Sequence, residues 1–194
     1  MPHLPDDVLG AIRAARALLP AGHRQLLNAI GVQEGLVQRW TDDVIAMYAT
    51  LREPTPTVSS LNGAAAAWLH ELRTVVFNAQ LFDQVLHGLD APSRDSFIRS
   101  VAWHEYGHAL SVVRAGREQR QQGLQLLALL PEPMREAIDY PGRYRTSQVF
   151  DEIMATLYAL LVDRVRISGY SPPDFLHPDV FAAFKEVYPW PPSP

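Results

Sequence analysis

The residues best suited to do chemistry are two histidines and a glutamate in the segment HEYGH, at His104, Glu105 and His108. Residues four positions apart in a helix lie on one face, so the two imidazoles can bind a single metal ion. Glu105 is one position further round the helix, where its carboxylate can act on a water molecule beside that ion. The chain has no cysteine, so any metal must be held by nitrogen and oxygen atoms. Imidazole and carboxylate ligands favour zinc, and we therefore predict a Zn2+ cofactor.

A catalytic zinc site needs a third protein ligand. The extended pattern that supplies a third histidine fails here, because Ser111 and Arg114 stand where it requires glycine and histidine. A glutamate from a later helix is the remaining source, and Glu152 is the best candidate. Small residues that would let two helices pack closely follow it: Ala155, Thr156 and Ala159. The remaining histidines have no paired spacing and are predicted to be surface or core residues: His3, His23, His70, His87 and His177.

Helical patterns separated by proline- and glycine-rich breaks dominate the chain, and they predict an α+β, mostly helical fold. The HEYGH segment lies in a helix expected over residues 93–116. Gly107 lies in its interior, where glycine costs about 1 kcal/mol relative to alanine, so something is expected to approach the backbone closely there. Further helices are expected at residues 6–19, 124–130, 150–165 and 178–187. Residues 23–51 are expected to form one helix, or two with an interruption near Gly31. The best strand candidate is 73–77 (RTVVF), and 64–72 fits either a helix or a strand.

Composition limits the classes of function. The chain has 194 residues, 47% of them apolar, which is typical of one globular domain. Its 17 basic and 21 acidic residues argue against nucleic acid as a partner, and no apolar run approaches the 18 residues of a membrane span. The N-terminal residues do not resemble a secretory signal, so a cytoplasmic location is the default, with non-classical export left open. The oligomeric state is left open.

Two blocks, HEYGHAL at 104–110 and FDEIMATLYALL at 150–161, resemble the gluzincin clan of zinc metallopeptidases. They are most similar to its small members, the minigluzincins and the catalytic domain of anthrax lethal factor. The resemblance implies a zincin-like fold with an HExxH active-site helix and a small sheet containing an edge strand. It also implies that His104, His108 and Glu152 bind zinc and that Glu105 is the general base. A peptide or protein substrate would then lie along an edge strand formed by residues 73–77.

A tyrosine shortly before the ligand glutamate helps to polarise the scissile carbonyl in this family. Tyr144 is the candidate for this catalytic role, with Tyr140 second. The chain departs from many relatives at Thr156, where they carry an acidic residue that orients a histidine. A hydroxyl accepts an imidazole N–H less strongly than a carboxylate does.

These patterns predict an N-terminal helical region at 1–60, a zincin-like catalytic domain at 61–188 and a proline-rich tail at 189–194. The predicted function is zinc-dependent hydrolysis of peptide bonds. The alternative is a zinc-binding regulatory or effector protein on the same scaffold, with narrow or no general proteolytic activity. The segment YPWPPSP at the end of the chain either occupies the substrate groove, which would make the enzyme latent, or lies elsewhere on the surface.

Overall fold

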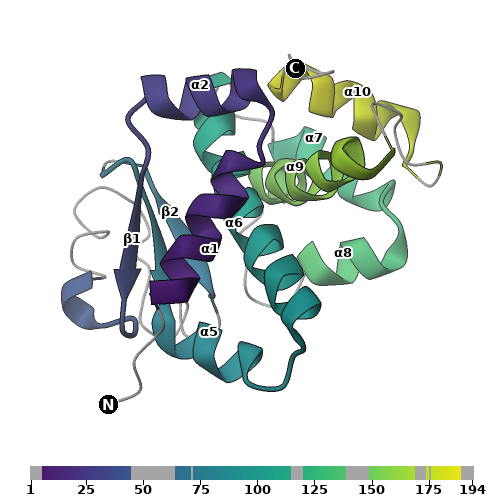
Figure 1. Cartoon of the computed structure of the whole chain (residues 1–194). Helices are drawn as coiled ribbons and strands as arrows, with labels where there is room; N and C mark the ends of the chain where they lie inside the picture. The colour runs from purple at the N-terminus through teal and green to yellow at the C-terminus, as the bar shows by residue number, and fades with distance from the viewer. Residues whose placement is uncertain are drawn as a thin grey trace.

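The computed structural model describes residues 6–44, 64–70, 72–114, 120–138, 149–168, 174 and 176–188. Over these residues the chain is an α+β protein, mostly helical, with one three-stranded sheet (Figure 1), which confirms the predicted fold class at this level. In chain order the elements are α1 (Asp6–Ala17), α2 (Ala21–Ala29), β1 (Gln33–Val37), β2 (Ala66–Leu69), β3 (Thr74–Asn78), α5 (Ala79–Leu86), α6 (Ala91–Arg114), α7 (Arg120–Ala128), α8 (Glu132–Ile138), α9 (Val149–Ser168) and α10 (Pro178–Val187). No helix in this part of the chain combines the length and the apolarity needed to cross a membrane.

The sheet has the strand order β1-β3-β2, with β1 parallel to β3 and β2 antiparallel to it. The strand predicted at residues 73–77 is confirmed as β3, but the expectation that it is an edge strand is wrong. Val75, Val76 and Phe77 are each at most 5% exposed, so both faces of this strand are buried. Such a continuous apolar run suits a central strand, whereas a half-exposed edge strand would alternate in polarity.

The two edge strands come from segments with weaker patterns. β2 shows that residues 64–72, which fitted either a helix or a strand, contain a strand. β1 lies within residues 23–51, where helix was expected, and that expectation is wrong for residues 33–37. Gly31 follows α2 with a φ of 74°, a conformation that glycine adopts without strain and that redirects the chain into β1. The N-terminal region therefore contributes a strand to the same sheet as β3.

The helices agree more closely with their patterns. α1, α6, α9 and α10 confirm the helices expected at 6–19, 93–116, 150–165 and 178–187 within a few residues at each end, and α7 overlaps the one expected at 124–130. Short α5 and α8 were not predicted. Asn78 starts α5 as its N-cap, accepting a hydrogen bond from the backbone N–H of Leu81 at 3.2 Å.

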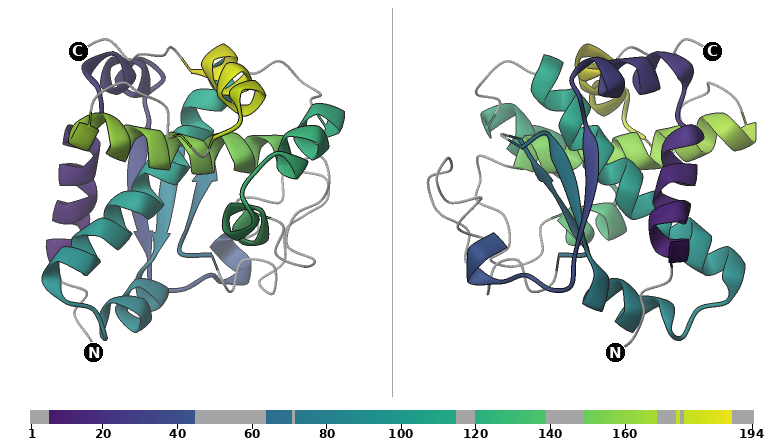
Figure 2. Two further views of the ribbon diagram at one scale, coloured as in Figure 1. Left: turned by 90° about the vertical axis from the view of Figure 1, so that its right-hand side faces the viewer. Right: turned by 60° about the vertical axis from the view of Figure 1, so that its left-hand side comes forward.

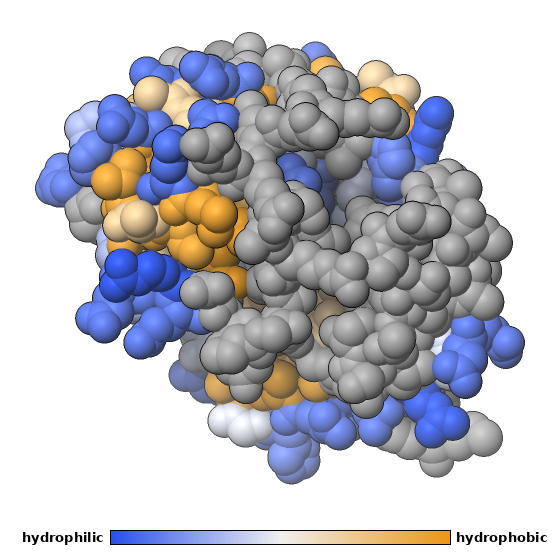
Figure 3. All heavy atoms as spheres, turned by 180° about the vertical axis from the view of Figure 1, so that it is seen from behind, coloured by the Kyte–Doolittle hydropathy of each residue, from blue (hydrophilic) through white to orange (hydrophobic). Residues whose placement is uncertain are grey.

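Helix α6 is the centre of the packing. It contacts α1, α2, β2 and α9, and α9 crosses it (Figure 2, left). One face of the sheet joins this main core through Ala66, Trp68, Val75 and Phe77. The opposite face carries a smaller cluster built from Trp40, Leu69 and Val76. On the face shown in Figure 3, apolar and hydrophilic residues lie side by side.

Candidate metal centre

The candidate centre lies where α6 and α9 cross, and Gly107 determines how closely they approach. A Cβ atom built on Gly107 would lie 2.9 Å from Ala155 Cα and 3.0 Å from Tyr158 Cβ. These separations are too short for carbon atoms, so only glycine fits at this position. The expectation of a close backbone approach at Gly107 is confirmed, and so is the close helix packing expected from the small residues after Glu152.

This crossing brings the three predicted ligands together. The Nε2 atoms of His104 and His108 are 3.1 Å apart. Glu152 places Oε2 3.3 Å from His104 Nε2 and Oε1 3.4 Å from His108 Nε2. One ligand atom from each residue lies within 4.8 Å of the others.

These separations fit zinc. Nitrogen and oxygen ligands lie about 2.0–2.2 Å from a tetrahedral zinc ion, so two of its ligand atoms are about 3.3 Å apart. The His104 side chain remains 26% exposed, against 14% for His108 and 15% for Glu152. The cluster therefore offers three ligand atoms at tetrahedral spacing and is most accessible at His104.

Charges inside the cluster support one another. Burial alone would lower the pKa of His108, but the carboxylates of Glu152, Glu105 and Asp151 raise it to about 9. Burial alone would likewise raise the pKa of Glu152, but His108 and hydrogen bonds from both histidines hold it well below its usual range. Without a metal, the site is consequently an ion pair between an imidazolium and a carboxylate.

Glu105 lies on the neighbouring face of α6 and is only 7% exposed. Burial raises the pKa of its carboxyl group, and the two histidines offset part of this effect. The carboxylate also accepts a hydrogen bond from the backbone N–H of Trp68, in β2. A raised pKa suits a group that must accept a proton near neutral pH.

This hydrogen bond shows which edge of the sheet lies beside the site. Asn78 N–H donates to Ala65 O at 2.8 Å, and Ala67 is paired with Val76. Because backbone groups alternate in direction along an antiparallel ladder, Ala66 and Trp68 direct theirs away from β3. The outer edge of β2 therefore faces Glu105. The sequence held no signal for this role of Trp68, because it depends on how the strands pair.

Thr156 lies as expected behind His104, with its Oγ1 atom 3.5 Å from Nδ1. The other predicted catalytic residue, Tyr144, lies outside the described residues, as do Tyr140 and the tail at 189–194. The structure thus brings together His104, Glu105, His108 and Glu152.

A polar network holds the opposite side of the HEYGH segment and was not predicted. Tyr106 is fully buried and donates a hydrogen bond to Glu34 Oε1 of β1 at 3.1 Å. Arg16 of α1 pairs with the same Glu34 oxygen and donates to Val32 O at 2.8 Å. The site helix is therefore anchored to both α1 and β1.

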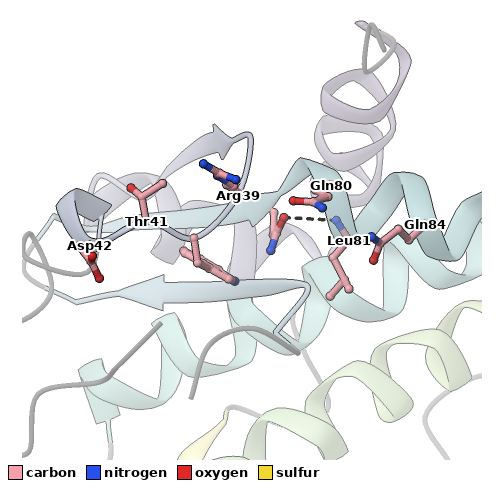
Figure 4. Close-up of a pocket in the computed structure, with 8 residues that line it drawn as sticks. Arg39, Thr41, Asp42, Gln80, Leu81 and Gln84 are labelled. Atoms are coloured by element: carbon pink, nitrogen blue, oxygen red, sulfur yellow. Dashed lines mark hydrogen bonds between the residues drawn. The ribbon is translucent and has the colours of Figure 1, made fainter. Parts of the chain in front are cut away.

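A separate cavity of 610 Å³ opens at the carboxyl ends of β1 and β3, beside the start of α5 (Figure 4). Its lining is largely polar: Arg39, Trp40, Thr41, Asp42, Asn78, Gln80, Leu81 and Gln84. It includes none of the predicted site residues, so the candidate metal centre and this cavity are distinct places in the fold.

The chain matches no protein-family model, and searches of curated proteins and of solved structures likewise find no match.

Proposed function

We propose that this protein is a zinc-dependent metallopeptidase of the gluzincin type, built on a zincin-like fold. The observation that carries the proposal is the convergence of His104, His108 and Glu152 at separations of 3.1–3.4 Å. Three protein ligands leave one position of a tetrahedral ion for water or substrate, which is the arrangement of catalytic zinc sites. Because the His104 side chain is partly exposed, the fourth coordination position would be open to solvent.

In this proposal Glu105 is the general base. When bound, zinc supplies Lewis-acid chemistry that polarises a carbonyl group and lowers the pKa of water. Glu105 accepts a proton from the attacking water and later donates it to the leaving amine, a role that its raised pKa favours. Tyr144 keeps its proposed part in polarising the scissile carbonyl.

The proposed substrate is an extended peptide segment, and the strand that receives it is β2. Residues 73–77 cannot take this role, because β3 has a strand on each side. The backbone groups of Ala66 and the Trp68 carbonyl point away from β3, on the side of β2 that faces Glu105, and these are the groups with which the peptide would pair. We propose protein or peptide substrates and a cytoplasmic location, with no role for nucleic acid or membrane.

Glu105→Gln tests this function. The amide keeps the size of the side chain but cannot accept the proton, so hydrolysis of a peptide library should fall about 10³-fold or more. Zinc content, measured in parallel, should stay at the wild-type value, because Glu105 is not a ligand. Glu186→Gln, the same change at an exposed position of α10, is the matched control and should leave both values unaltered. Undiminished cleavage by the Glu105 variant would refute the proposal.

One observation favours a second candidate, a zinc-binding regulatory or effector protein with narrow or no general proteolytic activity. The partner of His104 Nδ1 is a hydroxyl at 3.5 Å, which supports the imidazole less than a carboxylate would. Wild-type protein that binds one zinc ion but leaves casein and the peptide library intact would favour this candidate.

A further inference from the structure

A buried tyrosine directly after helix α10 reaches the backbone of the HEYGH segment. Tyr188 follows α10, is 1% exposed and donates a hydrogen bond from its hydroxyl to the Gly107 carbonyl at 2.9 Å. The Ser111 hydroxyl lies beside that of Tyr188, and its Oγ atom is 3.0 Å from the His108 carbonyl oxygen. Tyr188 is therefore connected to the backbone between and just behind the two candidate histidine ligands.

Gly107 is where α6 most needs such support. The close approach of Ala155 requires glycine there, yet glycine is the least favourable helix residue after proline. It sits between two ligands whose spacing depends on a regular helical turn. The Tyr188 ring packs against the rings of Tyr158 in α9 and Phe184 in α10, with ring centroids 4.9 and 4.8 Å apart. These contacts hold the Tyr188 hydroxyl in a fixed place.

We propose that Tyr188 is a positioning residue for the candidate zinc site: it fixes the Gly107 turn and thereby the spacing of His104 and His108. The inference rests on the proposed function, because the ligands are those of the proposed zinc site. It gives the C-terminal helix a role in metal binding although α10 supplies no ligand. A change that displaces α10 should weaken zinc binding from behind the site.

Tyr188→Phe and Tyr158→Phe make a matched pair. Each removes one buried phenolic hydroxyl from the same aromatic cluster, but the Tyr158 hydroxyl hydrogen-bonds His23 Nδ1 at 3.0 Å instead of α6. We expect Tyr188→Phe to raise the zinc dissociation constant about tenfold, the lower end of the effect of partners behind metal ligands. Tyr158→Phe should change it less than about twofold on the same reasoning. Zinc is titrated as the metal alone against a chelator.

Hydrogen–deuterium exchange of the metal-free proteins provides a readout that does not depend on zinc. Amides of residues 104–111 should exchange faster in Tyr188→Phe than in Tyr158→Phe. If the wild type binds no zinc but this difference is seen, the proposed function fails and the positioning role of Tyr188 stands. Equal exchange and equal zinc affinity in the two variants would overturn the positioning role, even if the wild type binds zinc tightly. Should Tyr188→Phe not fold, Ser111→Ala tests the same connection, and unchanged exchange at 104–111 would overturn it.

Discussion

Two histidine clusters lie along α9, and they differ in the group that α9 presents to the imidazole. Near its start, Glu152 places carboxylate oxygens 3.3 and 3.4 Å from His104 and His108. Further along, Tyr158 places a phenolic hydroxyl 3.0 Å from Nδ1 of His23, which belongs to α2. The first cluster combines two imidazoles with a carboxylate, whereas the second combines one imidazole with a neutral phenol.

Charge and exposure separate the two clusters. The carboxylates raise the pKa of His108 to about 9 against the effect of burial, while burial keeps Tyr158 protonated by raising its pKa well above the ordinary value. His104 is 26% exposed at its side chain and His23 only 1%. His23 is therefore a core residue, whereas His104 and His108 share their space with a carboxylate and are candidate ligands. The prediction that His23 is a surface or core residue is confirmed for the core.

The largest contrast should come from removing one histidine from each cluster. His108→Ala leaves two ligands, so we expect the zinc dissociation constant to rise on the order of 100-fold or more. His23→Ala should leave zinc stoichiometry unchanged but lower the free energy of unfolding by about 1–3 kcal/mol, because Tyr158 loses its buried partner. Zinc titration and thermal unfolding of both variants measure these effects. If His23→Ala stays folded but loses zinc, the two clusters do not differ in their role in zinc binding.

A second contrast tests the close crossing of α6 and α9 at Gly107. Gly107→Ala should lower the free energy of unfolding by about 1–2 kcal/mol, because the added methyl group meets Ala155 and better helix propensity offsets only part of this strain. Zinc affinity should fall with it, since α9 must move away and take Glu152 along. Gly10→Ala is the control: this exposed position in α1 has nothing within 4 Å, so alanine should stabilise the protein by about 0.5–1 kcal/mol. A neutral Gly107→Ala would show that the two helices can separate without cost.

The sequence predicts those parts of the site whose residues lie within a single helix. The spacing of His104 and His108 in a helix defines a shared face, and small residues after Glu152 mark a close helix contact. Both inferences use only local geometry. Glu34 and Tyr188 could not be found in this way, because each acts through a contact with α6 from a distant part of the chain.

The sheet shows the same limit. The run of apolar residues in β3 predicts a strand but does not say which neighbours it has. β1 has the short sequence QEGLV, with a glycine and no clear alternation, so its pairing with β3 decides that it is a strand. Without β1, β3 would be an edge strand, as the resemblance implied; its pairing with β1 makes it the central strand.

The pH dependence of zinc binding should reflect the carboxylate in the first cluster. Because the pKa of His108 is raised to about 9, the imidazole is protonated at pH 7 and zinc must displace that proton. Raising the pH removes the competing proton, so the apparent zinc affinity should rise by about tenfold per pH unit between pH 7 and 8 and level off above about 9. Titrations in a series of buffers measure the slope, and His23→Ala should reproduce it. A flat profile over this range would mean that Glu152 does not hold His108 in its charged form.

The smallest effect concerns the hydroxyl behind His104. Thr156→Val keeps the shape of the side chain but removes the hydroxyl whose Oγ1 atom lies 3.5 Å from His104 Nδ1. Because this contact is long, we expect the zinc dissociation constant to rise only a few-fold, less than the roughly tenfold or more typical of carboxylate partners. Thr156→Asp should have the opposite sign, since a carboxylate accepts the imidazole N–H more strongly.

Thr74→Val is the matched control for this pair. The Thr74 hydroxyl donates to Leu72 O at 2.9 Å, at the far end of β3 from the α5 cap, so its loss should leave zinc affinity unchanged. If Thr156→Asp binds zinc no more tightly than the wild type, the carboxylate at Glu152 already supplies the support that distinguishes this cluster from the one around His23. If it binds more tightly, the hydroxyl of Thr156 limits the zinc affinity of the wild-type protein.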